Sequence, residues 1–219
     1  SGGRIHTSAA TVAVLRGQLD EARRLAAEVH PLFATRGPPG THDVALGCQV
    51  LDALREGEDV VLPRFDKLAD DRTHQDAWTH VVGRVDLVLF EGWCLKAAPE
   101  DEKALAIPLN ALERDEDAEG RWRRHCNDAL RRDYPALWSR IDALWFLQPP
   151  GFSIVRTWRW QQEQVLLARD PQRTGMDRAQ LDRFIQHYER TSRRLLATLP
   201  AMAERVVALD AQRRPRLPL

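Results

Sequence analysis

The chain has 219 residues, and its 32 lysines and arginines balance 32 aspartates and glutamates, so the formal net charge at pH 7 is zero. A hydrophobic fraction of 43% can fill a core and excludes wholesale disorder, and the balanced charge gives no global field that would attract nucleic acid or an anionic membrane. The three cysteines, Cys48, Cys94 and Cys126, form no CxxC pair, so we expect no disulfide framework and no zinc site. Together these features predict a cytoplasmic protein without nucleic-acid or membrane partners.

The N-terminal third of the sequence alternates short apolar runs with helical periodicity. Residues 36–43, RGPPGTHD, predict a loop because two prolines lack the N–H that a helix needs. The elements predicted around this loop are, in chain order, a strand over 11–15, a helix over 18–29, a helix from Asp43 to about Arg55 closed by Gly57, and a strand over 59–63.

The remainder of the sequence contains the clearest strand, VDLVLFE at 85–91. An apolar run of this kind between helices is typical of a parallel strand that is buried on both faces. The other predicted elements are a polar turn over 66–74, mostly helix over 100–145, strands over 141–147 and 152–156, and helices over 157–169 and 177–208. Strands that alternate with helices predict an α/β protein with a mainly parallel sheet flanked by helices.

Candidate catalytic residues follow two of the predicted strands. Parallel sheets bind ligands at the carboxyl ends of their strands. Glu91 ends the strand over 85–91, where a carboxylate can hold Mg²⁺ or act as a base, and a glutamate that caps the next helix is an equal alternative. Asp66 and Lys67 follow the strand over 59–63 and could deprotonate a hydroxyl and hold an anion, with a solvated turn as the commoner alternative.

Candidate binding residues lie on loops and helices. Asp43 predicts an N-cap at a loop-to-helix junction, and the preceding His42 could point at a ligand or pack at the surface. Arg123 and Arg124 belong to a cationic cluster that could close over phosphates, although ion pairs with the neighbouring acidic residues are the usual alternative. Arg159 lies near the start of a predicted helix, where it could face a nucleotide.

Seven short motifs occur in an order that resembles one family, the D-glycerate 3-kinase-like branch of the P-loop kinases, which is related to uridine kinase and phosphoribulokinase. The resemblance covers about residues 25–190. The motifs are GTHD at 40–43, LPRFDK at 62–67, DR with a later W (Asp71, Arg72, Trp78), VDLVLFEGW at 85–93, NALE at 110–113, WRWQQE at 158–163, and GM with a later HY (Gly175, Met176, His187, Tyr188).

The resemblance implies a three-layer P-loop NTPase-like fold in a single domain over 1–219, with a helical lid around 113–135. It implies an enzyme that uses ATP and Mg²⁺ to phosphorylate a hydroxyl of a small, glycerate-like hydroxy acid. It also implies roles for the candidate residues: Glu91 as catalytic acid and metal ligand, Asp66 as a second catalytic residue, His42, Asp43, Lys67 and Arg72 around the acceptor, and Arg123, Arg124 and Arg159 around the nucleotide.

The sequence departs from the family at two points. The family opens with GxxxxGK[ST], whose backbone amides and lysine cradle phosphates, whereas this chain has only Ser1, Gly2 and Gly3 there. The family's acidic segment after its second strand is also missing between Leu15 and Arg16. Either the chain is a catalytically inactive kinase-fold protein that binds a ligand or partner, or it lacks segments that its gene encodes. The abrupt junctions favour the second explanation. The sequence carries no signal of oligomeric state.

Overall fold

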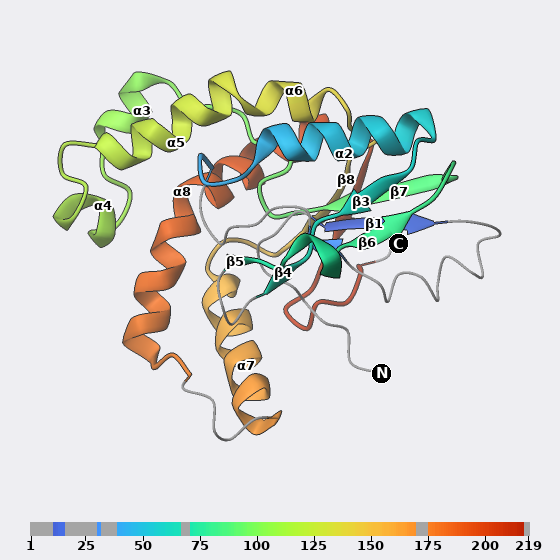
Figure 1. Ribbon diagram of the computed structural model, residues 1–219. Helices are drawn as coiled ribbons and strands as arrows, with labels where there is room; N and C mark the ends of the chain where they lie inside the picture. Colours follow the sequence, from blue (N-terminus) through green and yellow to red (C-terminus); the bar gives the residue numbers. More distant parts are fainter. Residues whose placement is uncertain (1–10, 16–29, 32–38, 67–70, 170–174, 217–219) are drawn as a thin grey trace. The chain divides into compact units, whose positions relative to one another are not determined.

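The structure is a computed structural model that describes residues 11–15, 30–31, 39–66, 71–169 and 175–216 (Figure 1). The chain divides into two compact units. The first comprises Ser1–Lys96 and Asp128–Asp142, and the second comprises Ala97–Asn127 and Ala143–Leu219. The single kinase domain with a helical lid therefore stays a prediction, and each unit is described by itself.

The described residues of the first unit form short strands and helices. The strands described in this unit form sheets with the orders β2-β1-β7, β3-β6 and β4-β5, and all of these strand pairs are antiparallel. The elements are β1 (Thr11–Leu15), β2 (His30–Pro31), α2 (Val44–Glu56), β3 (Val60–Leu62), β4 (Phe65–Asp66), β5 (Asp71–Arg72), a 3-10 turn (Gln75–Ala77), β6 (Thr79–Val81), β7 (Leu87–Glu91) and α6 (Tyr134–Trp138).

Helix α2 forms where the sequence predicts it. The Asp43 carboxylate accepts a hydrogen bond of 3.0 Å from the backbone N–H of Leu46, which satisfies one of the amides that a helix start leaves unpaired. Gly57 ends the helix in the left-handed conformation, with φ of 77°, which glycine adopts at no steric cost. The apolar stripe that includes Val50 and Leu54 is buried, and α2 packs on α6 and β3.

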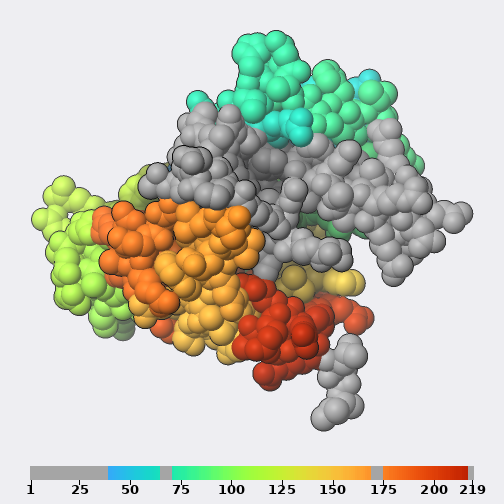
Figure 2. Space-filling model, turned by 90° about the horizontal axis from the view of Figure 1, so that it is seen from below, coloured from blue at the N-terminus to red at the C-terminus, as the bar shows by residue number. Residues whose placement is uncertain are grey.

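The second unit is mainly helical. Its parallel strands β8 and β9 pair from Trp145 opposite Arg205 to Gln148 opposite Ala208. The long helices α7 and α8 lie side by side, and Figure 2 shows their surfaces in two shades of orange. The elements are α3 (Glu102–Ala106), α4 (Ala111–Asp115), α5 (Arg121–Arg132, which the unit boundary divides after Asn127), β8 (Trp145–Gln148), α7 (Ile154–Arg169), α8 (Arg178–Met202) and β9 (Arg205–Ala208).

The start and the inner face of α8 follow from local sequence. Asp177 caps the helix by accepting from the N–H of Gln180 at 2.8 Å, and the Gln180 side chain accepts from the N–H of Asp177 at 2.9 Å. This reciprocal capping box pairs two backbone amides at once. The helix then buries one stripe of its surface, made of Leu181, Ile185, Leu195 and Leu199.

The strand pairings differ from those that the sequence predicts. The strand expected over 85–91 begins at Leu87, runs antiparallel to β1, and leaves the Leu87 and Leu89 side chains about half exposed. Among the described residues, β8 and β9 form the only parallel pair. The structure is therefore a mixed α/β protein with small sheets, and the mainly parallel three-layer sheet is not confirmed. An apolar run predicts burial, but it does not specify the strand's partner or direction.

Two predicted elements near the C-terminus are wrong. The sequence predicts a strand over 152–156, but α7 begins at Ile154, directly after Ser153, because the apolar spacing continues with a helical period. The helix expected over 177–208 ends at Met202, and its last residues form β9, whose β-branched residues Val206 and Val207 pair with β8. The helix expected over 18–29 lies outside the described residues.

Candidate active site

His42 lies in the turn before α2 and contacts a buried tyrosine. Its Nδ1 atom is 2.5 Å from the hydroxyl oxygen of Tyr134, which belongs to α6. The same hydroxyl accepts a hydrogen bond of 3.2 Å from the backbone N–H of Gly40. Burial lowers the pKa of His42 to about 4, because the low-polarity surroundings disfavour the charged imidazolium. The imidazole is therefore neutral at pH 7.

A small cavity joins this turn to the end of β7. Its volume is about 10 Å³, roughly the space that one water molecule needs. Its lining includes His42 and Tyr134 together with Gly92 and Trp93, which directly follow Glu91. Glu91 itself is exposed at the last position of β7. The structure thus brings together two of the predicted site segments, the loop before α2 and the carboxyl end of β7.

Asp43 and Arg72 form an ion pair in the same unit. While one Asp43 oxygen caps α2, the other lies 3.1 Å from an Arg72 Nη atom, and both side chains are about one third exposed. The Asp66 backbone pairs with Asp71, the neighbour of Arg72, across β4 and β5. Lys67 lies outside the described residues. Asp43 therefore has the capping role that the sequence predicts and also contacts a second predicted acceptor residue.

Acid should destabilise the fold through His42. An unfolded histidine has a pKa of 6.5, and the folded value is about 4, so between these values only the unfolded chain binds the proton. The stabilising contribution of His42 is fully present above pH 6.5. The free energy of unfolding should fall by about 2–3 kcal/mol as the pH drops to 4. Urea unfolding of the wild type and of His42→Gln at pH 7 and pH 4.5 measures this loss, and an equal loss in the two proteins would contradict it.

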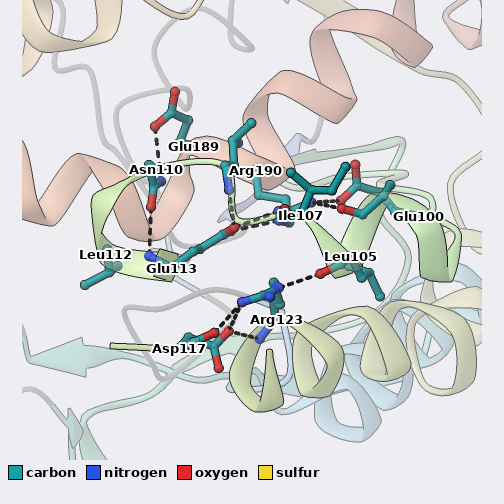
Figure 3. Close-up of polar contacts among 12 residues, drawn as sticks. Glu100, Leu105, Ile107, Asn110, Leu112, Glu113, Asp117, Arg123, Glu189 and Arg190 are labelled. Atoms are coloured by element: carbon teal, nitrogen blue, oxygen red, sulfur yellow. Dashed lines mark hydrogen bonds and ion pairs between the residues drawn. The ribbon is translucent and has the colours of Figure 1, made fainter. Parts of the chain in front are cut away.

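Arg123, a predicted nucleotide contact, is buried in the second unit. Its side chain is 4% exposed, its Nε donates to the carbonyl of Leu105 at 2.6 Å, and Asp117 accepts at 3.1 Å from both its backbone N–H and a guanidinium nitrogen (Figure 3). Arg124 is more accessible, with its Nε 3.5 Å from a carboxylate oxygen of Glu102. The geometry of Arg123 thus supports a structural role, while a nucleotide contact of either arginine stays a prediction.

Gly120 makes room for the buried Arg123 side chain. Its φ is +72°, and a Cβ at this position would lie 2.9 Å from the Arg123 guanidinium carbon, which hydrogen bonds hold in place. Gly120→Ala should therefore cost about 2 kcal/mol of stability, through both backbone strain and overpacking. Gly151→Ala is the matched control, because nothing lies within 4 Å of its added Cβ. Denaturant midpoints measure both, and equal midpoints would contradict the role of Gly120.

Two motifs of the second unit meet between α7 and α8. Glu163, from WRWQQE, is 2% exposed and accepts a hydrogen bond of 3.0 Å from the backbone N–H of Met176, from the GM motif. A Cβ on Gly175 would lie 2.8 Å from a methyl carbon of Leu167, so glycine suits this close approach. Arg159 lies with its guanidinium carbon 5.1 Å from the ring centre of Phe184. These residues fix α7 against α8.

The second unit contains a buried ionic network that the sequence does not predict. Arg190 of α8 binds Glu113 through two hydrogen bonds of 2.7 and 2.6 Å and contacts Glu100 at 3.0 Å (Figure 3). Asn110 caps α4 by accepting from the N–H of Glu113 at 3.0 Å, and it donates to the carbonyl of Gln186 at 3.0 Å. The NALE motif thus joins α4 to α8. Nothing in the local sequence around Arg190 indicates its distant partners.

Comparisons with known proteins point to kinases. The chain is 33% identical over 171 residues to the uncharacterized kinase mug58 of Schizosaccharomyces pombe. This alignment covers 73% of this chain and 58% of that protein. It is 31% identical over 196 residues to the chloroplastic D-glycerate 3-kinase of Arabidopsis thaliana, covering 82% of this chain and 40% of that protein. The D-glycerate 3-kinase structure from Cryptococcus neoformans superposes with a TM-score of 0.62 at 27% identity, covering 83% of this chain and 68% of that one. No protein-family model matches.

The fold is mixed α/β, and these similar proteins are all named as kinases. The relatives and the structural neighbour support a D-glycerate 3-kinase-like family, so the resemblance predicted from the seven motifs is confirmed. The chain spans 58% and 40% of the two curated relatives, which is less than two thirds of either.

Proposed function

We propose that this protein is an ATP-dependent kinase that transfers the γ-phosphoryl group to a hydroxyl of glycerate or a closely similar small hydroxy acid. The observation that carries the proposal is the cavity lined by both His42 and the residues just after Glu91, because it brings two predicted site segments into one place. The naming of two relatives as D-glycerate 3-kinases supports glycerate as the acceptor.

Glu91 is the residue that we propose for Mg²⁺. The described residues contain no group of three or more metal-ligating side chains, so a cage made of protein alone is not expected among them. Mg²⁺ commonly binds one or two carboxylates and completes its shell with water and substrate phosphates, and a single exposed carboxylate at a strand end fits this habit. Bound to ATP, the ion would neutralise charge on the transferred phosphoryl group.

The acceptor side of the proposed site is made of residues from the first unit. Arg72 is partly exposed, and its planar guanidinium suits a carboxylate such as that of a hydroxy acid. Neutral His42 can hydrogen-bond an acceptor oxygen, and Asp66 is proposed as the base that takes the hydroxyl proton. Asp43 and Lys67 are proposed to line the same site. The remaining candidates, Arg123, Arg124 and Arg159, are proposed as nucleotide contacts.

Two features of the described residues bear on the protein's location and partners. No helix of the described residues has both the length and the apolar character needed to cross a bilayer. Cys48, Cys94 and Cys126 are free thiols, which suits a reducing compartment. The cytoplasm and the absence of nucleic-acid and membrane partners therefore stay our predictions, with ATP and the hydroxy acid as the proposed substrates.

The test is phosphoryl transfer by the purified full-length protein that the gene encodes. We expect D-glycerate to stimulate ADP release in the presence of Mg²⁺ and ATP, and phosphorus NMR should show a phosphoglycerate, with no product when Mg²⁺ or glycerate is omitted. No turnover with glycerate or any other small hydroxy acid would reject the proposal. Calorimetric binding of a hydroxy acid or nucleotide without turnover would instead support a catalytically inactive, ligand-binding protein.

A further inference from the structure

Residues 209–216 form a turn that follows β9, at the carboxyl end of the parallel strand pair. The Asp210 carboxylate holds this turn together by accepting hydrogen bonds of 2.8 Å from the backbone N–H groups of Gln212 and Arg214. The first N–H of the turn donates at 2.8 Å to the carbonyl of Gln148, the last residue of β8. Because β8 and β9 are parallel, their carboxyl ends share one edge, and such edges are where α/β proteins bind ligands.

The 209–216 turn contacts Trp158 of α7 in three ways. The Trp158 indole N–H donates to the carbonyl of Ala211 at 2.8 Å, and the Arg213 guanidinium donates to the carbonyl of Trp158 at 3.1 Å. The guanidinium carbon of Arg213 also lies 5.0 Å from the centre of the Trp158 ring, within the range of a cation–π interaction. The turn therefore holds both the side chain and the backbone of Trp158.

Arg213 makes these contacts from a backbone conformation that arginine disfavours. Its φ is +64°, in the left-handed region where Cβ crowds the following carbonyl. Glycine or asparagine adopts this conformation at a lower cost. A disfavoured conformation persists where the surrounding contacts compensate for it. The turn itself does not require an arginine at this position, whereas the link to Trp158 does.

We infer that Arg213 is a positioning residue that holds the start of α7 and thereby orients Arg159, the next residue after Trp158, toward the nucleotide. The part of this inference that concerns the nucleotide rests on the proposed function, in which Arg159 contacts ATP. The Arg159 guanidinium also lies against the Phe184 ring of α8, so its position depends on how α7 is held. A cation whose backbone is fixed before binding loses less freedom when an anionic ligand arrives.

The hold on Trp158 can be measured in the full-length protein without turnover. In ¹H–¹⁵N spectra, the Trp158 indole N–H should exchange with solvent at least about 10-fold more slowly than that of Trp122, which is 46% exposed. Arg213→Asn suits the left-handed backbone, removes the guanidinium and should abolish this difference. Arg214→Asn, at the exposed neighbour in the same turn, is the matched control and should preserve it. Equal exchange of the two indoles in the wild type would overturn the inference, whether or not a variant folds.

A kinetic experiment tests the link to the nucleotide. Arg213→Asn should raise KM for ATP roughly 3- to 10-fold and leave KM for glycerate unchanged, whereas Arg214→Asn should change neither. Equal KM for ATP in the two variants, or an equal rise in both KM values for Arg213→Asn, would overturn the inference while the proposed function stands. If the protein transfers no phosphoryl group, the proposed function fails, and the exchange rates still decide whether Arg213 holds Trp158.

Discussion

Replacing Glu91 with glutamine should lower the rate of phosphoryl transfer to glycerate by at least about 100-fold, the usual effect of losing one charged group that stabilises a transition state. Glutamine keeps the shape of the side chain and removes the negative charge that Mg²⁺ requires. Because Glu91 is exposed at the end of β7, the same change should shift stability by less than about 0.5 kcal/mol. Steady-state kinetics and thermal unfolding of the same preparations measure the two effects.

The matched control for Glu91 is Glu58→Gln. Glu58 is another exposed carboxylate of the first unit, in the turn that follows α2, and its loss should leave both rate and stability unchanged. The Glu91 variant should also need more Mg²⁺ to reach half of its own maximal rate, because its metal site is weakened. Equal turnover of the two variants would reject Glu91 as the metal ligand and leave the rest of the proposal to stand on the acceptor residues.

Sequence predicts those parts of this structure that depend on near neighbours along the chain. The limits of α2 follow from Asp43 and Gly57, each of which acts on backbone groups within a few residues. The strand at Thr11–Leu15 likewise follows from its own β-branched run. Asp43 was predicted as a cap and as an acceptor residue, and its pairing with Arg72 across 29 positions is consistent with both roles.

The parts of the structure that the sequence does not predict depend on contacts between residues far apart in the chain. The direction of β7 is set by its pairing with β1, and no periodicity within VDLVLFE can reveal an antiparallel partner. Tyr134 lies 92 positions from His42, so nothing near GTHD identifies it. Sequence also fails to predict the burial of Arg123. A basic residue among charged neighbours suggests a solvated surface, whereas Arg123 is buried by its contacts with Asp117 and Leu105.

In the network around Arg190, hydrogen bonds keep a largely buried carboxylate ionised. Burial alone would raise the pKa of Glu113, but hydrogen bonds from Arg190 and from the N–H of Leu109 outweigh it and lower that pKa below the usual 4.5. The stability that this carboxylate contributes is therefore present above its unfolded pKa and is lost as the pH falls through the folded value. The carbonyls of Ala104 and Ile107 also accept from the guanidinium, at 3.2 and 2.8 Å.

Arg190→Met should therefore destabilise the protein by about 3–5 kcal/mol, because it leaves the carboxylates of Glu113 and Glu100 in a poorly solvated site without their cation. Arg131→Met removes an exposed arginine that pairs with Asp128 one turn away, and it should cost less than about 0.5 kcal/mol. Urea unfolding at pH 7 compares the two variants. Adding Glu113→Gln to Arg190→Met should recover part of the loss, since it removes one of the two unpaired charges. Equal costs for the two arginines, or a further loss in the double variant, would show that the network does not stabilise the fold.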